Sequence, residues 1–190
     1  GLPAGVANLV TGPGSEVGDE IVTSDAVDAI SFTGSSAVGE MVYEQATADG
    51  KRVQTELGGK NPTVVSASAD INEAADIVGS GAFGVTGQAC TACSRAIVYE
   101  DIHDEFVNAI VEYAESIEIG PGLEDPDMGP HVTESELEGT LEYVDVGKKE
   151  GATLAAGGEA LSDGEYADGH FVEPTVFTEV DRNMRLFQEE

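Results

Sequence analysis

Short β-rich runs alternate with helical runs along this chain. Every-second-residue alternation of apolar and polar positions indicates a half-buried strand, and apolar residues three or four positions apart indicate a helix. Strands are predicted at residues 5–11, 28–34, 52–57, 61–67, 95–100, 153–158 and 173–180. Helices are predicted to end near Ser24, to cover 35–48, 101–117 and 134–151, and to run from Asp70 toward Gly87.

The residues between these runs indicate helix starts, turns and a boundary between domains. The domain boundary is expected at Gly58-Gly59, which interrupts two predicted strands. Asp70 with Glu73 three positions later is typical of a capped helix start. A Gly-rich turn is predicted at 12–18 and a Pro/Gly-rich loop at 121–130, whereas residues 183–190 favour no element. Strands that alternate with helices of this length predict βαβ units and a mostly parallel sheet, the α/β class.

Acidity is the one strong feature of the composition. The 190 residues include 37 Asp and Glu but 8 Lys and Arg, a net charge of −29, while 41% of residues are apolar. The apolar content predicts a folded protein with an acidic surface. A polyanion repels nucleic acid and anionic membranes, so neither is an expected partner. Salt screens such self-repulsion, because the Debye length falls to about 3 Å at 1 M. We therefore expect the protein to come from a microbe that accumulates salt. The alternative is an ordinary acidic protein.

The sequence contains no targeting or membrane signal. No run approaches the roughly 18 apolar residues of a membrane span, and no basic stretch precedes an apolar one as in a secretory leader. A cytoplasmic location is therefore expected. The chain opens on Gly1 in mid-pattern and ends on Glu190 without a closing element, which suggests a fragment of a longer protein.

Both cysteines lie in the segment GQACTACSR, residues 87–95. Cys90 and Cys93 could form a redox pair, half of a metal site, one nucleophile beside a bystander, or two inert thiols. A structural zinc site needs four ligands, usually two such pairs, and this chain has one pair. Its three histidines share no spacing with the cysteines and are expected to be structural. No metal site is therefore expected, and the pair by itself decides nothing further.

Three other segments could carry chemistry, and each has a plainer explanation. GPGSEVG (12–18) departs from the strict dinucleotide spacing and could be an ordinary turn. TGSSAVG (33–39) lies between a predicted strand and helix, where Gly34 and Ser35 could bind phosphate or simply cap the helix. Glu56 ends a predicted strand just before Gly58-Gly59, which suits a general base but also a solvated strand end.

Taken together, FTGSSAVG, ELGGK (56–60) and GQACTACSR, in this order, resemble the aldehyde dehydrogenase superfamily. The 34 residues from Glu56 to Cys90 agree with the family pattern, as do GLPAGVANLVTGPG near the start and EPTVF near the end. The resemblance implies a parallel-sheet aldehyde dehydrogenase-like fold. Residues 1–58 would then be the C-terminal part of an NAD(P)-binding domain, and 59–190 a catalytic domain that lacks its C-terminal end.

The resemblance also implies roles for individual residues. Cys90 would attack an aldehyde carbonyl, and Glu56 would activate the water that hydrolyses the resulting thioester; Cys93 would be a neighbour and not a partner. The cofactor would be NAD or NADP. The residues that the resemblance assigns to cofactor binding are Gly34, Ser35, Val38, Gly39, Leu57, Gly58 and Glu190.

The expected reaction is oxidation of an aldehyde, an aliphatic semialdehyde, to a carboxylic acid. GQACTACSR and ELGGKNP look most like the branch that acts on semialdehydes such as α-ketoglutarate semialdehyde, with succinate semialdehyde or another aliphatic aldehyde left open. The full-length protein is expected to form homodimers or homotetramers, and these 190 residues alone to be inactive. The alternatives are a CxxC thiol-disulfide oxidoreductase and a non-catalytic structural relative.

Overall fold

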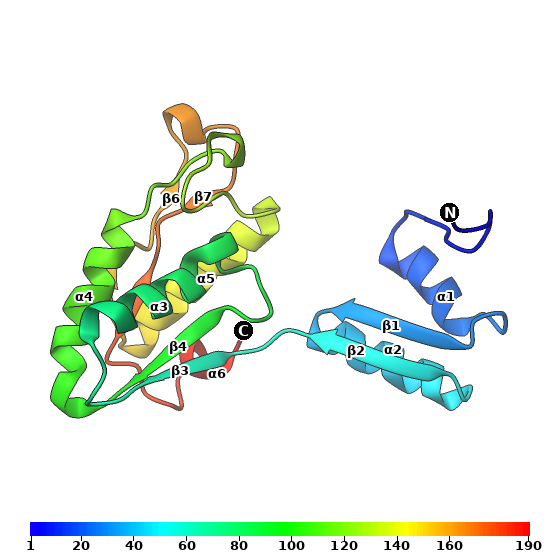
Figure 1. The fold of residues 1–190 in the computed structure, drawn as a ribbon, viewed down its shortest axis with the longest axis horizontal. Coiled ribbons are helices and arrows are strands. Elements are labelled where there is room, and N and C mark those ends of the chain that lie inside the picture. Colours follow the sequence, from blue (N-terminus) through cyan, green and yellow to red (C-terminus); the bar gives the residue numbers. More distant parts are fainter. The chain divides into compact units, whose positions relative to one another are not determined.

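A computed structural model describes residues 1–190. The chain forms two compact units, Gly1–Gly58 and Gly59–Glu190 (Figure 1). The boundary falls between Gly58 and Gly59, in the short segment that separates the strand ending at Leu57 from the strand beginning at Asn61. Assignment of the two units to cofactor binding and catalysis stays a prediction.

The first unit contains one βαβ element. After the helical turns η1 (Gly14–Gly18) and α1 (Asp19–Thr23), strand β1 (Ala29–Gly34) leads through helix α2 (Ser36–Ala48) into strand β2 (Arg52–Leu57). The two strands are parallel, with Thr33 opposite Glu56 and Gly34 opposite Leu57. Its small core consists of buried Val22, Val42 and Ala46, with Ile30, Phe32 and Val53 packed against them.

The second unit begins with another βαβ element. Strand β3 (Asn61–Val65), helix α3 (Ile71–Phe83), the turn η2 (Gly84–Gly87) and strand β4 (Cys93–Val98) follow in order, and β3 and β4 are parallel. The remaining elements are η3 (Glu100–Ile102), α4 (His103–Ser116), η4 (Gly122–Glu124), α5 (Glu134–Glu150), β5 (Thr153–Ala156), β6 (Ala160–Leu161), η5 (Gly164–Tyr166), β7 (Phe171–Val172), β8 (Val176–Thr178) and α6 (Arg185–Gln188). None of these helices combines the length and apolar character that a membrane crossing requires.

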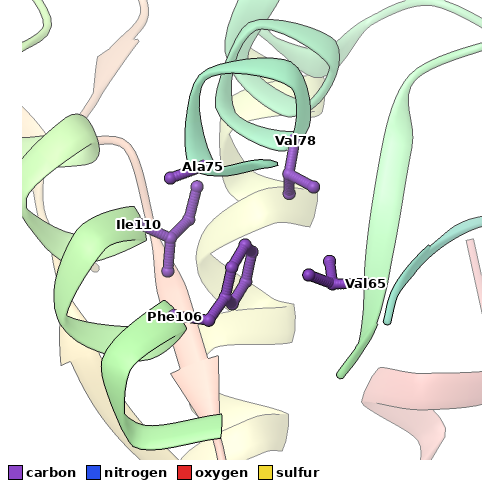
Figure 2. Close-up of a cluster of buried hydrophobic side chains, with 5 residues drawn as sticks. All are labelled: Val65, Ala75, Val78, Phe106 and Ile110. Carbon is purple, nitrogen blue, oxygen red and sulfur yellow. The ribbon is translucent and has the colours of Figure 1, made fainter. Parts of the chain in front are cut away.

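The core of the second unit is centred on Phe106. This ring projects from α4 toward α3 and is 2% exposed (Figure 2). It lies among Val65, Ala75, Val78 and Ile110. The start of α3 is capped as the sequence predicts, since the Asp70 carboxylate accepts a hydrogen bond of 3.1 Å from the Glu73 N–H.

Two predictions near the N-terminus are wrong. Residues 5–11 form no strand: Leu9 and Val10 are 89% and 68% exposed, and no other segment pairs with them. An alternating segment forms a strand only when another strand pairs with it and its apolar side chains are buried, and no strand pairs with residues 5–11. The expected turn at 12–18 is largely helical, because the Val17 N–H bonds the Pro13 carbonyl (2.9 Å) and η1 continues into α1.

The second half of the later unit also differs from a parallel sheet. β5 pairs with β8, and β6 with β7, and both pairs are antiparallel. A parallel return would need a long crossover, usually a helix, whereas the connection from β5 to β8 contains only β6, the three-residue turn η5 and β7. β6 and β7 are too short for any periodicity to mark them, and the segment left unassigned at 183–190 contains α6.

Candidate active site

Cys90 lies at the tip of a turn between α3 and β4. The turn is closed by a hydrogen bond of 2.8 Å from the Ala92 N–H to the Ala89 carbonyl. Cys90 is exposed, and its thiol is free. The backbone N–H groups of Cys90 and Thr91 donate to no acceptor in the chain. The turn thus presents a free thiol together with two free N–H donors, the groups that nucleophilic attack on a carbonyl requires.

Asn61, the first residue of β3, holds this turn from one side. Its side-chain Nδ2 donates to the carbonyl of Cys90 (2.7 Å) and to that of Ala92 (3.1 Å). Gly59 approaches the same place, since a Cβ built on it would lie 3.8 Å from the Cys90 carbonyl oxygen. Sequence reasoning missed Asn61, although it directly follows the ELGGK segment.

The segment Gly129–Val132 holds the other side of the loop. Thr86 Oγ1 donates to the Gly129 carbonyl (3.0 Å), and the Val132 N–H donates to Gln88 Oε1 (2.9 Å). Gln88 Nε2 also reaches the Pro130 carbonyl at 3.4 Å. The Gln of the G-Q-x-C motif therefore fixes the loop that carries Cys90.

The same loop is strained. Val85, Thr86 and Gly87 have φ angles of 55°, 58° and 70°, in the left-handed region. β-branched residues rarely adopt this region, and each costs on the order of 1–3 kcal/mol. The hydrogen bonds to Gly129–Val132 offset this cost, and such strain is frequent next to reacting groups.

Cys93 has a different environment from Cys90. It is the first residue of β4, is half-buried, and packs against the Phe106 cluster. Its thiol donates to Thr63 Oγ1 at 3.1 Å. Both thiols are free, and no group of three or more His, Cys, Asp or Glu side chains is arranged to hold a metal ion.

Glu56 and all of the expected cofactor residues except Glu190 lie at one edge of the first unit. β1 ends at Gly34 and β2 at Leu57, and because the strands are parallel both ends lie at the same edge. Glu56 is exposed there and accepts a hydrogen bond of 3.1 Å from Gln54 Nε2. Ligands in open α/β sheets bind at this carboxyl edge.

Helix α2 begins at the same edge with unsatisfied backbone donors. The Ser35 hydroxyl accepts from the Val38 N–H (3.4 Å), whereas the N–H groups of Ser36 and Ala37 find no acceptor. A side chain at Gly39 would collide with Leu57, whose Cδ2 lies 2.3 Å from the position of a Cβ. Free N–H groups and the helix dipole favour a phosphate at this end, so the residues fit a dinucleotide diphosphate.

Glu190 lies in the second unit, near a pair of cations. Burial and the neighbouring Arg95 lower the pKa of Lys60 below its ordinary value, and the charges of Glu190 and Glu189 partly oppose that shift. Arg95 donates to the Lys60 carbonyl and stacks over the Phe187 ring at 4.7 Å. The predicted site residues therefore fall into two groups, one in each unit.

Comparison with known proteins extends these observations. All of residues 1–190 match the model of the aldehyde dehydrogenase family. The chain is 64% identical to an α-ketoglutarate semialdehyde dehydrogenase of Haloferax volcanii and 47% identical to an α-ketoglutaric semialdehyde dehydrogenase of Bacillus subtilis. Each match covers 100% of this chain and 39% of the relative.

Solved structures agree with this result. A 1-pyrroline-5-carboxylate dehydrogenase from Thermus with bound NAD superposes with a TM-score of 0.93 at 39% identity, over 100% of this chain and 37% of that one. The βαβ elements, the motifs and these matches lead to one conclusion: the chain belongs to the aldehyde dehydrogenase family and has its fold. It spans about two fifths of the length of these relatives.

Proposed function

We propose that this chain provides the nucleophile, the base and part of the cofactor site of an NAD(P)-dependent aldehyde dehydrogenase. The observation that carries the proposal is the Cys90 turn, in which an exposed thiol and unpaired N–H groups lie side by side in the sequence. The Cys90 thiolate adds to the aldehyde carbonyl to form a thiohemiacetal. The oxygen becomes negatively charged as the carbon–sulfur bond forms, and the Cys90 N–H donates to it.

Glu56 is the general base of the second half of the reaction. Oxidation of the thiohemiacetal leaves a thioester on Cys90, and water at neutral pH attacks thioesters slowly unless a base removes a proton. Glu56 accepts that proton as water adds, and Cys90 leaves as the carboxylic acid is released. The exposed carboxylate at the end of β2 supports this role.

The edge around α2 is the proposed binding site for the cofactor diphosphate. Gly34, Ser35, Val38 and Gly39 form the strand end and first helical turn, and Leu57 and Gly58 follow the base. When bound, a nicotinamide cofactor accepts two electrons and the hydrogen of the aldehyde carbon. We assign Glu190 a role in cofactor binding on the resemblance alone.

The proposed substrate is an aliphatic semialdehyde, first of all α-ketoglutarate semialdehyde. Two relatives that cover this entire chain are named for that substrate, at 64% and 47% identity. We further propose that the full-length enzyme is a cytoplasmic homo-oligomer, a dimer or tetramer. The choice between NAD and NADP stays open.

The rival proposal, a redox pair of Cys90 and Cys93, has less support. A disulfide exchange site needs two thiols that both react. Cys93 instead is half-buried and donates to Thr63. The difference between the two thiols favours a single nucleophile.

Three substitutions in the natural full-length protein test the proposal. Cys90→Ala should reduce aldehyde-dependent NAD(P)H formation to background, while Cys93→Ala should keep most of it. Glu56→Gln should keep a first-turnover burst of reduced cofactor but lose steady-state turnover, because the acyl-enzyme accumulates. Equal loss of activity in the two cysteine variants would instead support the redox pair.

A panel of α-ketoglutarate semialdehyde, succinate semialdehyde and an uncharged aldehyde of similar length then tests substrate specificity.

A further inference from the structure

We propose that Asn61 is a positioning residue, whose side-chain amide orients the Cys90 turn so that the Cys90 N–H faces the developing oxyanion. The inference rests on the proposed function of Cys90. It adds a residue outside the three motifs, and it predicts a specific defect that differs from loss of the thiol.

The amide of Asn61 uses both of its hydrogens on the turn. One goes to the Cys90 carbonyl at 2.7 Å and the other to the Ala92 carbonyl at 3.1 Å. Together with the Ala92-to-Ala89 hydrogen bond, these two hydrogen bonds fix the turn at both of its later carbonyls.

Fixing these carbonyls also determines where the free N–H groups point. A peptide unit is planar and trans, so the Thr91 N–H points away from the side on which the Cys90 carbonyl meets Asn61. The Cys90 N–H belongs to the preceding peptide unit. If the Cys90 carbonyl were not held, rotation about the backbone bonds of Cys90 would change the direction of this N–H. Asn61 is thereby suited to hold an oxyanion donor in place without touching the substrate.

The local sequence gives the Asn61 side chain this reach. The β3–β4 ladder shifts register between Asn61 and Pro62, and proline has no N–H to give to the ladder. Asn61 lies opposite Cys93, three residues beyond the nucleophile. Gly59 lies beside it, at a distance where a Cβ would be in ordinary van der Waals contact with Asn61 Oδ1 (3.4 Å).

The test separates oxyanion-dependent from oxyanion-independent chemistry at the same sulfur. Acylation of Cys90 by p-nitrophenyl acetate passes through a tetrahedral oxyanion, whereas alkylation by iodoacetamide does not. Both are measured without cofactor on the full-length protein in a Cys93→Ala background, which leaves one local thiol to follow. Mass spectrometry of the 87–95 peptide assigns the product to Cys90.

Asn61→Ala should slow acylation by about 10- to 100-fold, which is the effect of a small misplacement of a catalytic group. Alkylation should stay within about threefold of the wild-type rate, because the SN2 reaction needs no oxyanion donor. Asn61→Asp keeps the size of the side chain but lacks the two N–H donors, so it should show the same selective loss. Asn108→Ala, at an exposed position on α4, is the matched control and should change neither rate.

Two results would overturn the inference. Wild-type acylation in Asn61→Ala would show that the amide positions nothing, and a parallel loss of acylation and alkylation would show a merely structural role. Failure of the proposed function is distinguishable from both, because Cys90→Ala would then retain acylation at the wild-type rate. A melting curve of each variant in molar KCl shows whether the fold is kept.

Discussion

The two units of this chain divide the expected chemistry but differ in how they are built. Gly59–Glu190 has a core centred on Phe106 that joins β3, α3 and α4. Gly1–Gly58 has three buried apolar residues and leaves others exposed, among them Leu2 at 76%. The proposed nucleophile therefore belongs to the better packed unit, while the proposed base and the proposed phosphate-binding edge belong to the less well packed one.

The difference illustrates how burial depends on size. A segment of about 60 residues buries a smaller fraction of its surface than a larger domain and is correspondingly marginal. In Gly1–Gly58 only α2 and the short α1 pack on one pair of strands, and apolar positions of α2 such as Met41 and Tyr43 stay exposed. We therefore expect the two units to differ in stability and in sensitivity to salt.

The largest expected effect is a cavity in the second unit. Phe106→Ala should lower its free energy of unfolding by about 3–5 kcal/mol, because a fully buried ring is lost and its neighbours relax only in part. Hydrogen exchange in molar KCl measures the effect on α3 and α4 separately from β1 and β2. Val42→Ala is the counterpart in the first unit and should cost about 1.5–2 kcal/mol for two methyl-sized groups. Equal loss of protection in both units from Phe106→Ala would mean that they unfold together, and the comparison would fail.

The parallel βαβ elements of both units were better predicted from sequence than the segments around them. The Asp70 cap and the strong periodicity of residues 101–117 predict two helices, and the structure confirms them as α3 and α4. Residues 5–11 carry a strand pattern without a strand, because pairing depends on a partner that local sequence does not describe. For the same reason the antiparallel pairing of β5 with β8 could not be read from their residues.

In the candidate site, too, only the features that local sequence carries could be predicted. Motifs point to Cys90 and Glu56 because their residue types and spacing are visible in the sequence. The contacts of Asn61 and Gln88 to carbonyls 29 and 42 residues away are tertiary and leave no local pattern. The left-handed Val85 and Thr86 were equally unforeseeable, since β-branched residues argue against that conformation.

Salt should stabilise both units, and the second more strongly. Gly1–Gly58 has nine acidic and two basic residues (net −7), and Gly59–Glu190 has 28 and six (net −22). Screening weakens the repulsion among these charges, so the melting temperature should be higher in molar KCl than in dilute buffer. A melting temperature that does not change with salt would contradict the expected adaptation to high salt.

Matched pairs of glutamates sharpen the salt comparison. Glu40 and Glu44 on α2 are four residues apart and exposed, as are Glu138 and Glu142 on α5. Like charges at this spacing destabilise a helix by about 0.2–0.5 kcal/mol per pair. Changing either pair to Gln should therefore stabilise the protein in dilute buffer and have little effect in molar KCl. The α5 pair should give the larger gain, since Glu134 extends the same row of charges.

The smallest expected effect concerns one imidazole of the second unit. His131 is 7% exposed, its Nε2 meets Thr140 Oγ1 at 2.8 Å, and its Nδ1 has no partner. Burial lowers the pKa of His131 below the ordinary 6.5, and the charge of Glu136 opposes this only in part. The unfolded chain therefore takes up a proton first as the pH falls through about 6.5, so His131 makes the fold less stable toward acid and has no such effect above that pH. His131→Gln, which has an amide in place of the titrating ring, should flatten the fall in melting temperature between pH 7 and 5. At pH 8, where the imidazole is neutral in both states, any remaining difference in melting temperature measures the lost contacts alone.

If the melting temperature of the variant falls between pH 7 and 5 as steeply as that of the wild type, protonation of His131 does not limit the stability of this unit.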